Sequence, residues 1–404
     1  MLLTLAWRNI WRNRNRSLIT MASIASAVLL AVLTAALQKG VFDNLIHNVV
    51  SLYTGHMQIH EKGYWDEQIL DNAFLMNDTL EQQVNQLEEL IAAAPRLETF
   101  SLISSGEKTK GALVIGVAPE AENRLTNLQG KLVKGDFLKE NDKNALLAEG
   151  LAEKLKVVVG DTIVLLAQGF YGSTAAGKFA IGGLLHFGSP ELNGQVVYLS
   201  LPTAQTWLDA PGMATTLALT IRNDDALHQT AADLKNILPA HYEVLTWEDM
   251  MPEIVQHIKT DTVGMYIMIG VLYLIIAFGI FSTLLMMLAE RQREFGMLVS
   301  LGMQKFKIAR MLLVESVLLT LFGCLAGVAL SLPATWYLTV HPIKFTGELA
   351  KVYEQFGFEA IFPATMDPAI FINQTLVVLV LGLVLSMYPV LKLLKLDPVA
   401  AMRR

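Results

Sequence analysis

The chain has 404 residues, of which 53% are hydrophobic and only 17% are charged, and its formal net charge is −6. Because soluble domains carry about a quarter charged residues, this composition excludes an ordinary soluble protein. The single cysteine, Cys324, lies in an apolar run, which excludes a disulfide framework and a cysteine-based metal site.

The chain begins with a basic segment, residues 1–17, that contains no acidic residue. Its apolar side chains recur at helical spacing with arginines on the other side: Leu3, Trp7, Ile10 and Trp11 against Arg8, Arg12 and Arg16. This pattern favours a cytoplasmic helix lying at the lipid headgroups. A plain basic anchor for the span that follows is the alternative.

Four runs are long enough to cross a bilayer, which needs about 20 apolar residues. They predict transmembrane helices at 18–38, 263–289, 311–340 and 369–391. Glu315 is the only charged residue within them. An intramembrane charge is a functional candidate by default, but we expect Glu315 to form a salt bridge or to reach the nearby interface. The first run is longer than the apolar core of a signal peptide, so we expect it to be retained.

Charge orients these spans, because arginine and lysine accumulate on the cytoplasmic side. The segments 1–17, 290–310 and 392–404, counted with Glu315, hold 13 basic and four acidic residues. The stretch 39–262 holds 16 basic and 29 acidic residues. We therefore expect both termini and the 290–310 link to be cytoplasmic, and 39–262 and the 341–368 loop to lie outside.

The outer stretch, 39–262, alternates strands and helices. Apolar spacings of four and three predict a helix over 78–94, capped by Asp78 or Thr79 and ended by Pro95. The same order returns later, with the expected elements Arg96–Ile103, Thr215–Ile221, Asp224–Leu238 and Tyr242–Leu245. We expect 39–107 and 213–262 to form one α/β subdomain.

Residues 108–212 are richer in glycine and predict an inserted, mostly β subdomain. Its expected strands are Ala112–Val117, Ala145–Ala148, Asp161–Ala167 and Gln195–Leu199. The run GSTAAGKF, 172–179, resembles a phosphate-binding loop, but Phe179 replaces the residue that holds magnesium and no helix pattern follows. We expect a hairpin or loop there, and the sequence assigns no role to the glycine-rich 169–190 segment.

From Trp247 to Ala289 the sequence predicts one helix, about 64 Å long at 1.5 Å per residue. Pro252 falls near its first turn, where proline is tolerated. Part of this helix would stand outside the membrane.

The 290–310 link leaves the second span with charged residues followed by an apolar patch. The charges are Glu290, Arg291, Arg293 and Glu294, and the patch is Phe295, Met297, Leu298 and Leu301. Gly302 then breaks the helix. A short helix of this kind can dock in a groove on a soluble partner, and a stop-transfer loop explains the pattern equally well.

Three motifs resemble FtsX-like ABC permeases of the MacB and LolC/LolE type. In that family the segment after the second span contacts the nucleotide-binding subunit, and it is matched here at Glu290, Arg291, Glu294, Phe295, Gly296, Leu298, Leu301 and Gly302. The closing motif is matched at Pro389, Asp397, Pro398, Val399, Ala401, Met402 and Arg403. The opening motif is matched at Arg8, Asn9, Arg12, Asn13 and Arg16.

The resemblance implies a membrane α-helical fold of four spans with a large α+β extracytoplasmic domain of two subdomains, in the bacterial inner membrane. It implies a dimeric, non-catalytic permease subunit, paired with a second copy or a paralogue. A separate cytoplasmic ATPase would bind ATP and magnesium. We expect the permease to transmit ATPase strokes that extrude or release a lipoprotein, lipid or amphipathic cargo.

Membrane lipids and a periplasmic adaptor or acceptor protein are further expected partners, and nucleic acid is not. The alternative function is that of an FtsX-like regulator of a cell-wall hydrolase, which transports nothing. No nucleophile elbow, paired-acid motif or metal-ligand spacing occurs, so we assign no catalytic, cofactor-binding or metal residue. The neighbours of His56 and His60 predict a strand.

Overall fold

The computed structural model describes residues 7, 8, 10–12, 14–348 and 361–395. The chain divides into two compact units. The bundle unit comprises Met1–Asp43, Ile258–Lys344 and Ile361–Arg404, and the sheet unit comprises Asn44–His257 and Phe345–Ala360. The positions predicted for Leu3, Asn9, Asn13, Asp397, Pro398, Val399, Ala401, Met402 and Arg403 lie outside the described residues.

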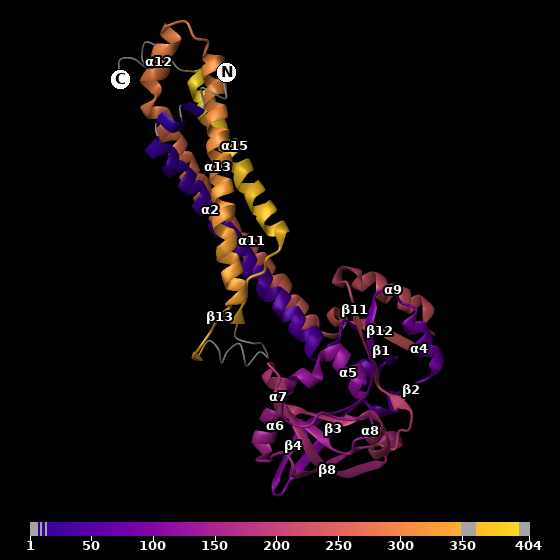
Figure 1. Ribbon diagram of the computed structural model, residues 1–404. Helices are drawn as coiled ribbons and strands as arrows, with labels where there is room; N and C mark the ends of the chain where they lie inside the picture. Colours follow the sequence, from indigo (N-terminus) through magenta and orange to yellow (C-terminus); the bar gives the residue numbers. More distant parts are fainter. Residues whose placement is uncertain (1–6, 9, 13, 349–360, 396–404) are drawn as a thin grey trace. The chain divides into compact units, whose positions relative to one another are not determined.

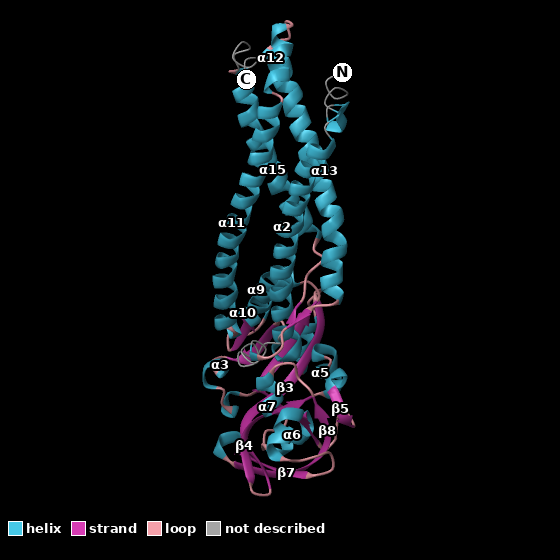
Figure 2. Ribbon diagram, turned by 90° about the vertical axis from the view of Figure 1, so that its left-hand side faces the viewer, coloured by secondary structure: helices cyan, strands magenta, loops and turns pink. Residues whose placement is uncertain are grey.

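Within the described part of the chain, four helices are long and apolar enough to cross a membrane. They are α2 (Arg14–Val49), α11 (Pro252–Glu290), α13 (Lys305–Val340) and α15 (Pro368–Leu394). Figure 1 and Figure 2 both show these helices lying lengthwise beside one another. A helix satisfies its own backbone hydrogen bonds, as a lipid environment requires. The prediction of four membrane helices is confirmed.

Two glycines allow α13 to lie close against α2. A Cβ atom added at Gly323 would lie 2.7 Å from the Cβ of Ile24, and one at Gly327 would lie 2.6 Å from the Cβ of Val28. Real Cβ atoms do not approach side chains so closely, so glycine is required at both positions. Small residues four apart are typical of close helix packing in membranes, where van der Waals contact replaces the hydrophobic effect.

The connection between α13 and α15 is fixed to α2. Its two short strands, β13 and β14, pair antiparallel, as Ile343–Lys344 with Ile361–Phe362. Thr365 donates its N–H to the carbonyl oxygen of Ala36 at 3.1 Å. Asp367, the N-cap of α15, forms an ion pair with Lys39. These contacts join the second half of the predicted 341–368 loop to the first span.

The helix that contains the second span begins at Pro252, so the prediction that it begins at Trp247 is wrong. Residues 247–250 form a separate turn, α10 (Trp247–Met250), closed by a capping box between Thr246 and Asp249. Met251 then leaves helical backbone (φ −128°, ψ 61°), because a residue before proline disfavours the helical region. The remaining helix, α11, has 39 residues and is about 58 Å long.

The sheet unit is built on a ten-stranded sheet of order β12-β1-β11-β3-β4-β9-β6-β8-β5, with β7 paired to β3 and β8. The strands are β1 (Met57–Glu61), β3 (Leu90–Ser105), β4 (Lys108–Val117), β5 (Leu132–Gly135), β6 (Ala145–Ala148), β7 (Thr162–Gln168), β8 (Thr174–Leu185), β9 (Val196–Ser200), β11 (Thr216–Ile221) and β12 (Tyr242–Thr246). β2 (Phe74–Leu75) pairs separately with β10 (Met213–Ala214).

Six of these strands close into a ring. β3 pairs with β4, β4 with β9, β9 with β6, β6 with β8, β8 with β7, and β7 returns to β3. The curved strands can be followed in Figure 2. A closed ring leaves no free edge between its members, and its inner side chains, such as Ile103, Val114 and Leu165, are fully buried.

Short helices connect and cover the strands. They are α3 (Tyr64–Glu67), α4 (Asp78–Asn85), α5 (Pro119–Thr126), α6 (Glu149–Leu155), α7 (Pro190–Gln195), α8 (Leu201–Trp207) and α9 (Leu227–Ile237). The strands expected in 108–212 are present as β4, β6, β7 and β9. Residues 174–179 of the GSTAAGKF run lie in β8, which pairs antiparallel with β7 and places Lys178 opposite Val164, so the expected hairpin is present.

The predicted helix over 78–94 is wrong in its second half. α4 ends at Asn85, and β3 begins at Leu90 and continues through Pro95. The spacing that suggested a helix includes Ala94, which is fully buried in the sheet while Ile91 is exposed. The N-cap is Asn77, whose side chain accepts from the Leu80 N–H at 2.8 Å, rather than Asp78 or Thr79.

Candidate functional site

The predicted coupling segment forms a short helix, α12 (Gln292–Ser300), one residue after α11. Arg291, with φ −94° and ψ 4°, separates the two helices. At the other end Gly302 has a left-handed φ of +94°. Its N–H donates to the Val299 carbonyl, and the next N–H, of Met303, donates to the Leu298 carbonyl, both at 3.0 Å. This Schellman arrangement favours glycine, so the prediction that Gly302 ends the helix is confirmed.

A buried ion pair fixes the residue before α12 to α13. Arg291 Nη1 donates to both carboxylate oxygens of Glu315, at 2.9 and 2.7 Å. The two residues are only 4% and 3% exposed. The guanidinium also lies 5.0 Å above the centre of the Phe295 ring. Because an unpaired buried charge is costly, each residue holds the other in place. Glu315 therefore forms a salt bridge, as expected.

The apolar patch of α12 divides between two faces. Phe295 is 1% exposed and packs in the core of the bundle, where Gly296 is also buried. Leu298 is half-buried against the same core. Met297 and Leu301, by contrast, are 54% and 79% exposed. The prediction that the Phe295 ring docks on a partner is therefore wrong, because this ring fills the core beneath Arg291.

The outer face of α12 presents an amphipathic stripe. Arg293, Met297 and Leu301 are exposed and follow one another at intervals of four residues, which places them on one side of the helix. Glu290 is exposed at the end of α11. We call Arg293, Met297 and Leu301 the outer stripe.

The basic segment before the first span lies at the same end of the bundle as α12. Arg12 Nη2 donates to Glu294 Oε2 at 2.8 Å, and both side chains are about half exposed. Trp7 packs on Phe322 of α13, with ring centres 5.5 Å apart. The opening and coupling motifs, nearly 300 residues apart in sequence, are thus in direct contact.

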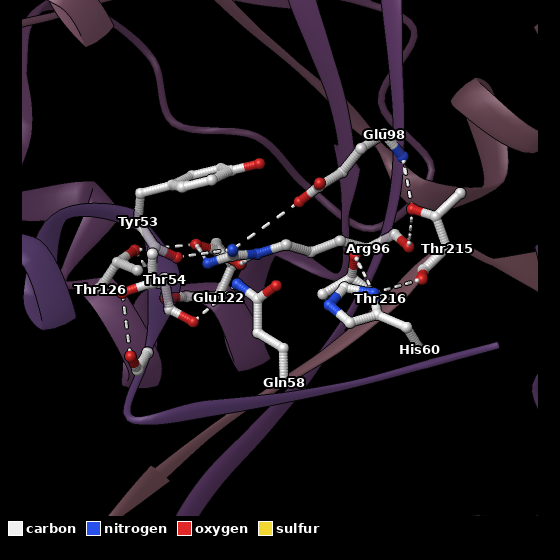
Figure 3. Close-up of polar contacts among 11 residues, drawn as sticks. Tyr53, Thr54, Gln58, His60, Arg96, Glu98, Glu122, Thr126, Thr215 and Thr216 are labelled. Carbon is white, nitrogen blue, oxygen red and sulfur yellow. Dashed lines mark hydrogen bonds and ion pairs between the residues drawn. The ribbon is translucent and has the colours of Figure 1, made fainter. Parts of the chain in front are cut away.

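A second group of functional interest is a buried polar cluster in the sheet unit, drawn in Figure 3. Arg96 of β3 and Glu122 of α5 are both 0% exposed. Arg96 donates from Nε and Nη2 to the two carboxylate oxygens of Glu122, at 2.9 and 2.8 Å. Its Nη1 donates to the main-chain carbonyl of Tyr53 at 2.6 Å. Thr126 Oγ1 donates to Glu122 Oε1 at 3.0 Å.

Burial sets the electrostatics of this cluster. It disfavours the Arg96 cation, but Glu122 outweighs that effect and raises the pKa of Arg96 above its usual value. Burial raises the pKa of Glu98, which lies 3.8 Å from the Arg96 Nη1 atom, although Arg96 opposes the shift. Burial also lowers the pKa of Lys131 to about 8, with Glu122 opposing. Arg96 and Glu122 thus form the charged centre, and Glu98 is held toward its neutral form.

His60 is a neutral member of the same region. Its Nδ1 lies 3.0 Å from the carbonyl oxygen of Thr215, an acceptor, so Nδ1 carries the proton. The ring stacks on Tyr64 with centres 5.1 Å apart. Burial lowers the pKa of His60 from 6.5 to about 4. Among the residues that the structure describes, no three His, Cys, Asp or Glu side chains gather as a metal site.

Comparison with known families now identifies the chain's class. The model of the MacB-like periplasmic core domain matches residues 17–237, which is more than half of the chain. The model of the FtsX-like permease C-terminal region matches residues 266–398. The chain belongs to the FtsX-like and MacB-like family of ABC transporter permeases. The bundle and sheet units are therefore its membrane part and its periplasmic α/β domain.

Two relatives resemble this permease over nearly its whole length, and a solved structure resembles about half of it. LolC, a lipoprotein-releasing system transmembrane protein of Xylella fastidiosa, is 25% identical over 97% of this chain and 95% of its own. MacB, a macrolide export ATP-binding/permease protein of a Shewanella species, is 23% identical over 97% of this chain and 58% of its own. The periplasmic region of MacB from Actinobacillus actinomycetemcomitans matches 52% of this chain and 95% of its own at 14% identity, with a TM-score of 0.36.

The sequence of the permease predicts the short helix after the second span, but it does not point to the Arg96–Glu122 pair. The two residues are 26 positions apart and belong to a strand and a helix that each carry other charges. The one available signal was the position of Arg96. It is a cation that directly follows the apolar run 90–95.

Proposed function

We propose that this permease subunit couples a separate cytoplasmic ATPase to movements of its periplasmic domain. The observation that carries the proposal is the two-sided construction of α12. Its start is fixed to α13 through Arg291 and Glu315, and Phe295 is buried, while its outer stripe is exposed. A force applied to the outer stripe would then pass into α11 and α13 rather than bend a loose loop.

The outer stripe suits a groove on a soluble protein. Arg293 offers a charge, and the strongly exposed Met297 and Leu301 offer apolar surface that would be removed from water on docking. Permeases of this kind work with an ATPase partner, and we propose that ATP and magnesium bind to that partner. On this proposal α12, both chain termini and the 290–310 link face the cytoplasm, in agreement with the positive-inside rule.

We further propose a dimer, formed with a second copy or a paralogue, and a cargo that is a lipoprotein, lipid or other amphipathic molecule. The lipoprotein-releasing function in the name of the LolC relative supports this cargo class. Within the apolar runs 18–38, 263–289, 311–340 and 369–391 the one charged residue is Glu315, and it is paired with Arg291. Because charged groups mark polar paths through a membrane, their scarcity in these runs favours extraction or release at the outer side of the bundle. A periplasmic adaptor or acceptor protein would take up the released cargo.

The outer stripe can be tested by adding charge to it. Replacing Met297 and Leu301 together by Asp should reduce both co-purification of the ATPase and its stimulation by about tenfold or more, since apolar anchors in interfaces each contribute 1 kcal/mol or more. The matched control is Gln304→Asp, which adds a charge to an exposed position of the same segment outside the stripe. Normal ATPase binding and stimulation in the double variant would end the coupling proposal.

A further inference from the structure

The outer end of the first membrane helix is capped by side chains of the sheet. α2 continues directly into a π-helical turn, η1 (Val50–Thr54). The last carbonyls of a helix have no partner within it and must find one elsewhere. Arg96 Nη1 supplies it for Tyr53 at 2.6 Å, and Gln58 Nε2 supplies it for Thr54 at 2.8 Å.

Arg96 is suited to hold a helix end because it carries a positive charge. The carbonyl end of a helix bears partial negative charge, which a cation stabilises. The guanidinium is also planar, so the fork to Glu122 fixes the direction of the bond to Tyr53. The Tyr53 ring also holds the guanidinium, because the guanidinium carbon lies 5.0 Å above the centre of that ring. One side chain therefore joins three elements: η1, β3 and α5 (Figure 3).

The strand that carries Arg96 reaches a large part of the sheet. β3 pairs with β11 through residues 90–96, with β4 from Arg96 onward, and with β7 through residues 102–104. Arg96 lies at the change from the first pairing to the second. A displacement of the Tyr53 carbonyl therefore acts on Arg96, the residue at which β3 changes from pairing with β11 to pairing with β4.

Stability alone does not require this arrangement. A buried ion pair is often replaced by apolar side chains of similar volume with no loss of stability, because apolar packing avoids the desolvation of two charges. Apolar packing is non-directional, however, and lets neighbouring surfaces slide. A bidentate ion pair with a third bond to a helix end resists sliding.

We propose that Arg96 is a positioning residue that transmits displacement of α2 to the periplasmic sheet, with Glu122 holding its guanidinium in place. The proposal rests on the mechanical function argued above and names the point at which that mechanism enters the periplasmic domain. Movement of the first span then displaces β3 without any rearrangement of the side chains inside the closed ring of six strands.

The test uses the full permease reconstituted with its ATPase in vesicles that contain a fluorescent diacylglyceryl-anchored lipoprotein. The key variant is Arg96→Met combined with Glu122→Leu, which removes both charges and leaves neither unpaired. We expect it to keep the melting temperature and the ATPase rate of the wild type. The amount of lipoprotein released per ATP hydrolysed should fall about tenfold, within the usual range of coupling between sites.

A second variant separates the positive charge of Arg96 from its fixed bonds to Glu122 and Tyr53. Arg96→Lys keeps one positive charge but cannot bond Glu122 and Tyr53 together in a fixed plane, so we expect intermediate release per ATP. Wild-type release per ATP in the double variant, with an unchanged melting temperature, would overturn the assignment of Arg96. A wild-type complex that hydrolyses ATP but releases no lipoprotein would instead overturn the proposed function.

Discussion

The ion pair between Arg291 and Glu315 offers the sharpest test of how α12 is held. Replacing Glu315 by Leu would leave the Arg291 cation 4% exposed and without the two bonds of 2.9 and 2.7 Å that neutralise it. Its remaining anionic partner, Glu294, is 3.4 Å away and about half exposed. Breaking a buried pair in this way typically costs about 3–5 kcal/mol of unfolding free energy.

Removing both charges should cost much less than removing one. In Arg291→Met with Glu315→Leu no buried charge remains, and we expect the unfolding free energy to return to within about 1 kcal/mol of the wild type. The matched control is Arg12→Met, which breaks an ion pair whose side chains are 57% and 45% exposed. Such surface pairs contribute about 0–1 kcal/mol, so this variant should behave like the wild type.

The assay is equilibrium unfolding of the detergent-solubilised permease, followed by tryptophan fluorescence. The wild type is compared with four variants, which are Arg291→Met, Glu315→Leu, the double variant and the control Arg12→Met. We expect the double variant to lose far less unfolding free energy than the sum of the losses in Arg291→Met and Glu315→Leu, because each single variant leaves a buried charge unpaired. Additive losses in the double variant would mean that the two side chains do not act as a pair. A loss in Arg12→Met as large as in Glu315→Leu would mean that burial does not set the magnitude.

Three further outcomes follow from other parts of the structure. Burial lowers the pKa of His60 in the folded state from 6.5 to about 4. As the pH falls, the unfolded state therefore binds a proton at His60 before the folded state does. The free energy of unfolding should be highest above pH 6.5 and fall by up to about 3 kcal/mol toward pH 4. Thermal melts of His60→Gln should lack this pH-dependent loss. Gly327→Leu should destabilise the bundle by about 1–3 kcal/mol through overlap with α2, whereas Gly279→Leu, which has open space at its Cβ, should not when both are melted in detergent. With Cys324 replaced, an impermeant thiol reagent applied to intact cells should label a cysteine at position 127 but not one at position 304.

The parts of the fold that were predictable are those with a strong local signal. A membrane helix is encoded by about 20 consecutive apolar residues, and all four helices were found from this alone. Gly302 was predictable because glycine after an apolar helical stretch marks a left-handed turn. Strands such as β6 and β7 are short apolar runs bounded by turn residues, and each was placed to within a residue.

The missed features depend on tertiary pairing. Residues 86–94 satisfy a helical apolar pattern, but Leu90 and its successors pair with β11, a strand more than 100 residues later. In the same way, Phe295 and Leu301 are equally apolar in sequence, but Phe295 is 1% exposed beneath the Arg291–Glu315 pair and Leu301 is 79% exposed. Amphipathic spacing gives two faces of a helix. It does not say which face meets the core when both carry charges and apolar groups.

The two buried arginines occupy comparable places, and this bears on how force moves along a membrane helix. Arg291 follows the last residue of α11 and is paired with Glu315. Arg96 meets the last turn of η1, which extends α2, and is paired with Glu122. Over the apolar runs 18–38 and 263–289 these helices carry no charged residue, and contacts such as those at Gly323 and Gly327 are van der Waals contacts that constrain distance more than register. Bonds at the helix ends have a defined direction and length. On the proposed function, an axial displacement would be passed on at these two arginines and at the ion pair between Lys39 and Asp367, where a bond of defined direction joins α2 to the connection before α15.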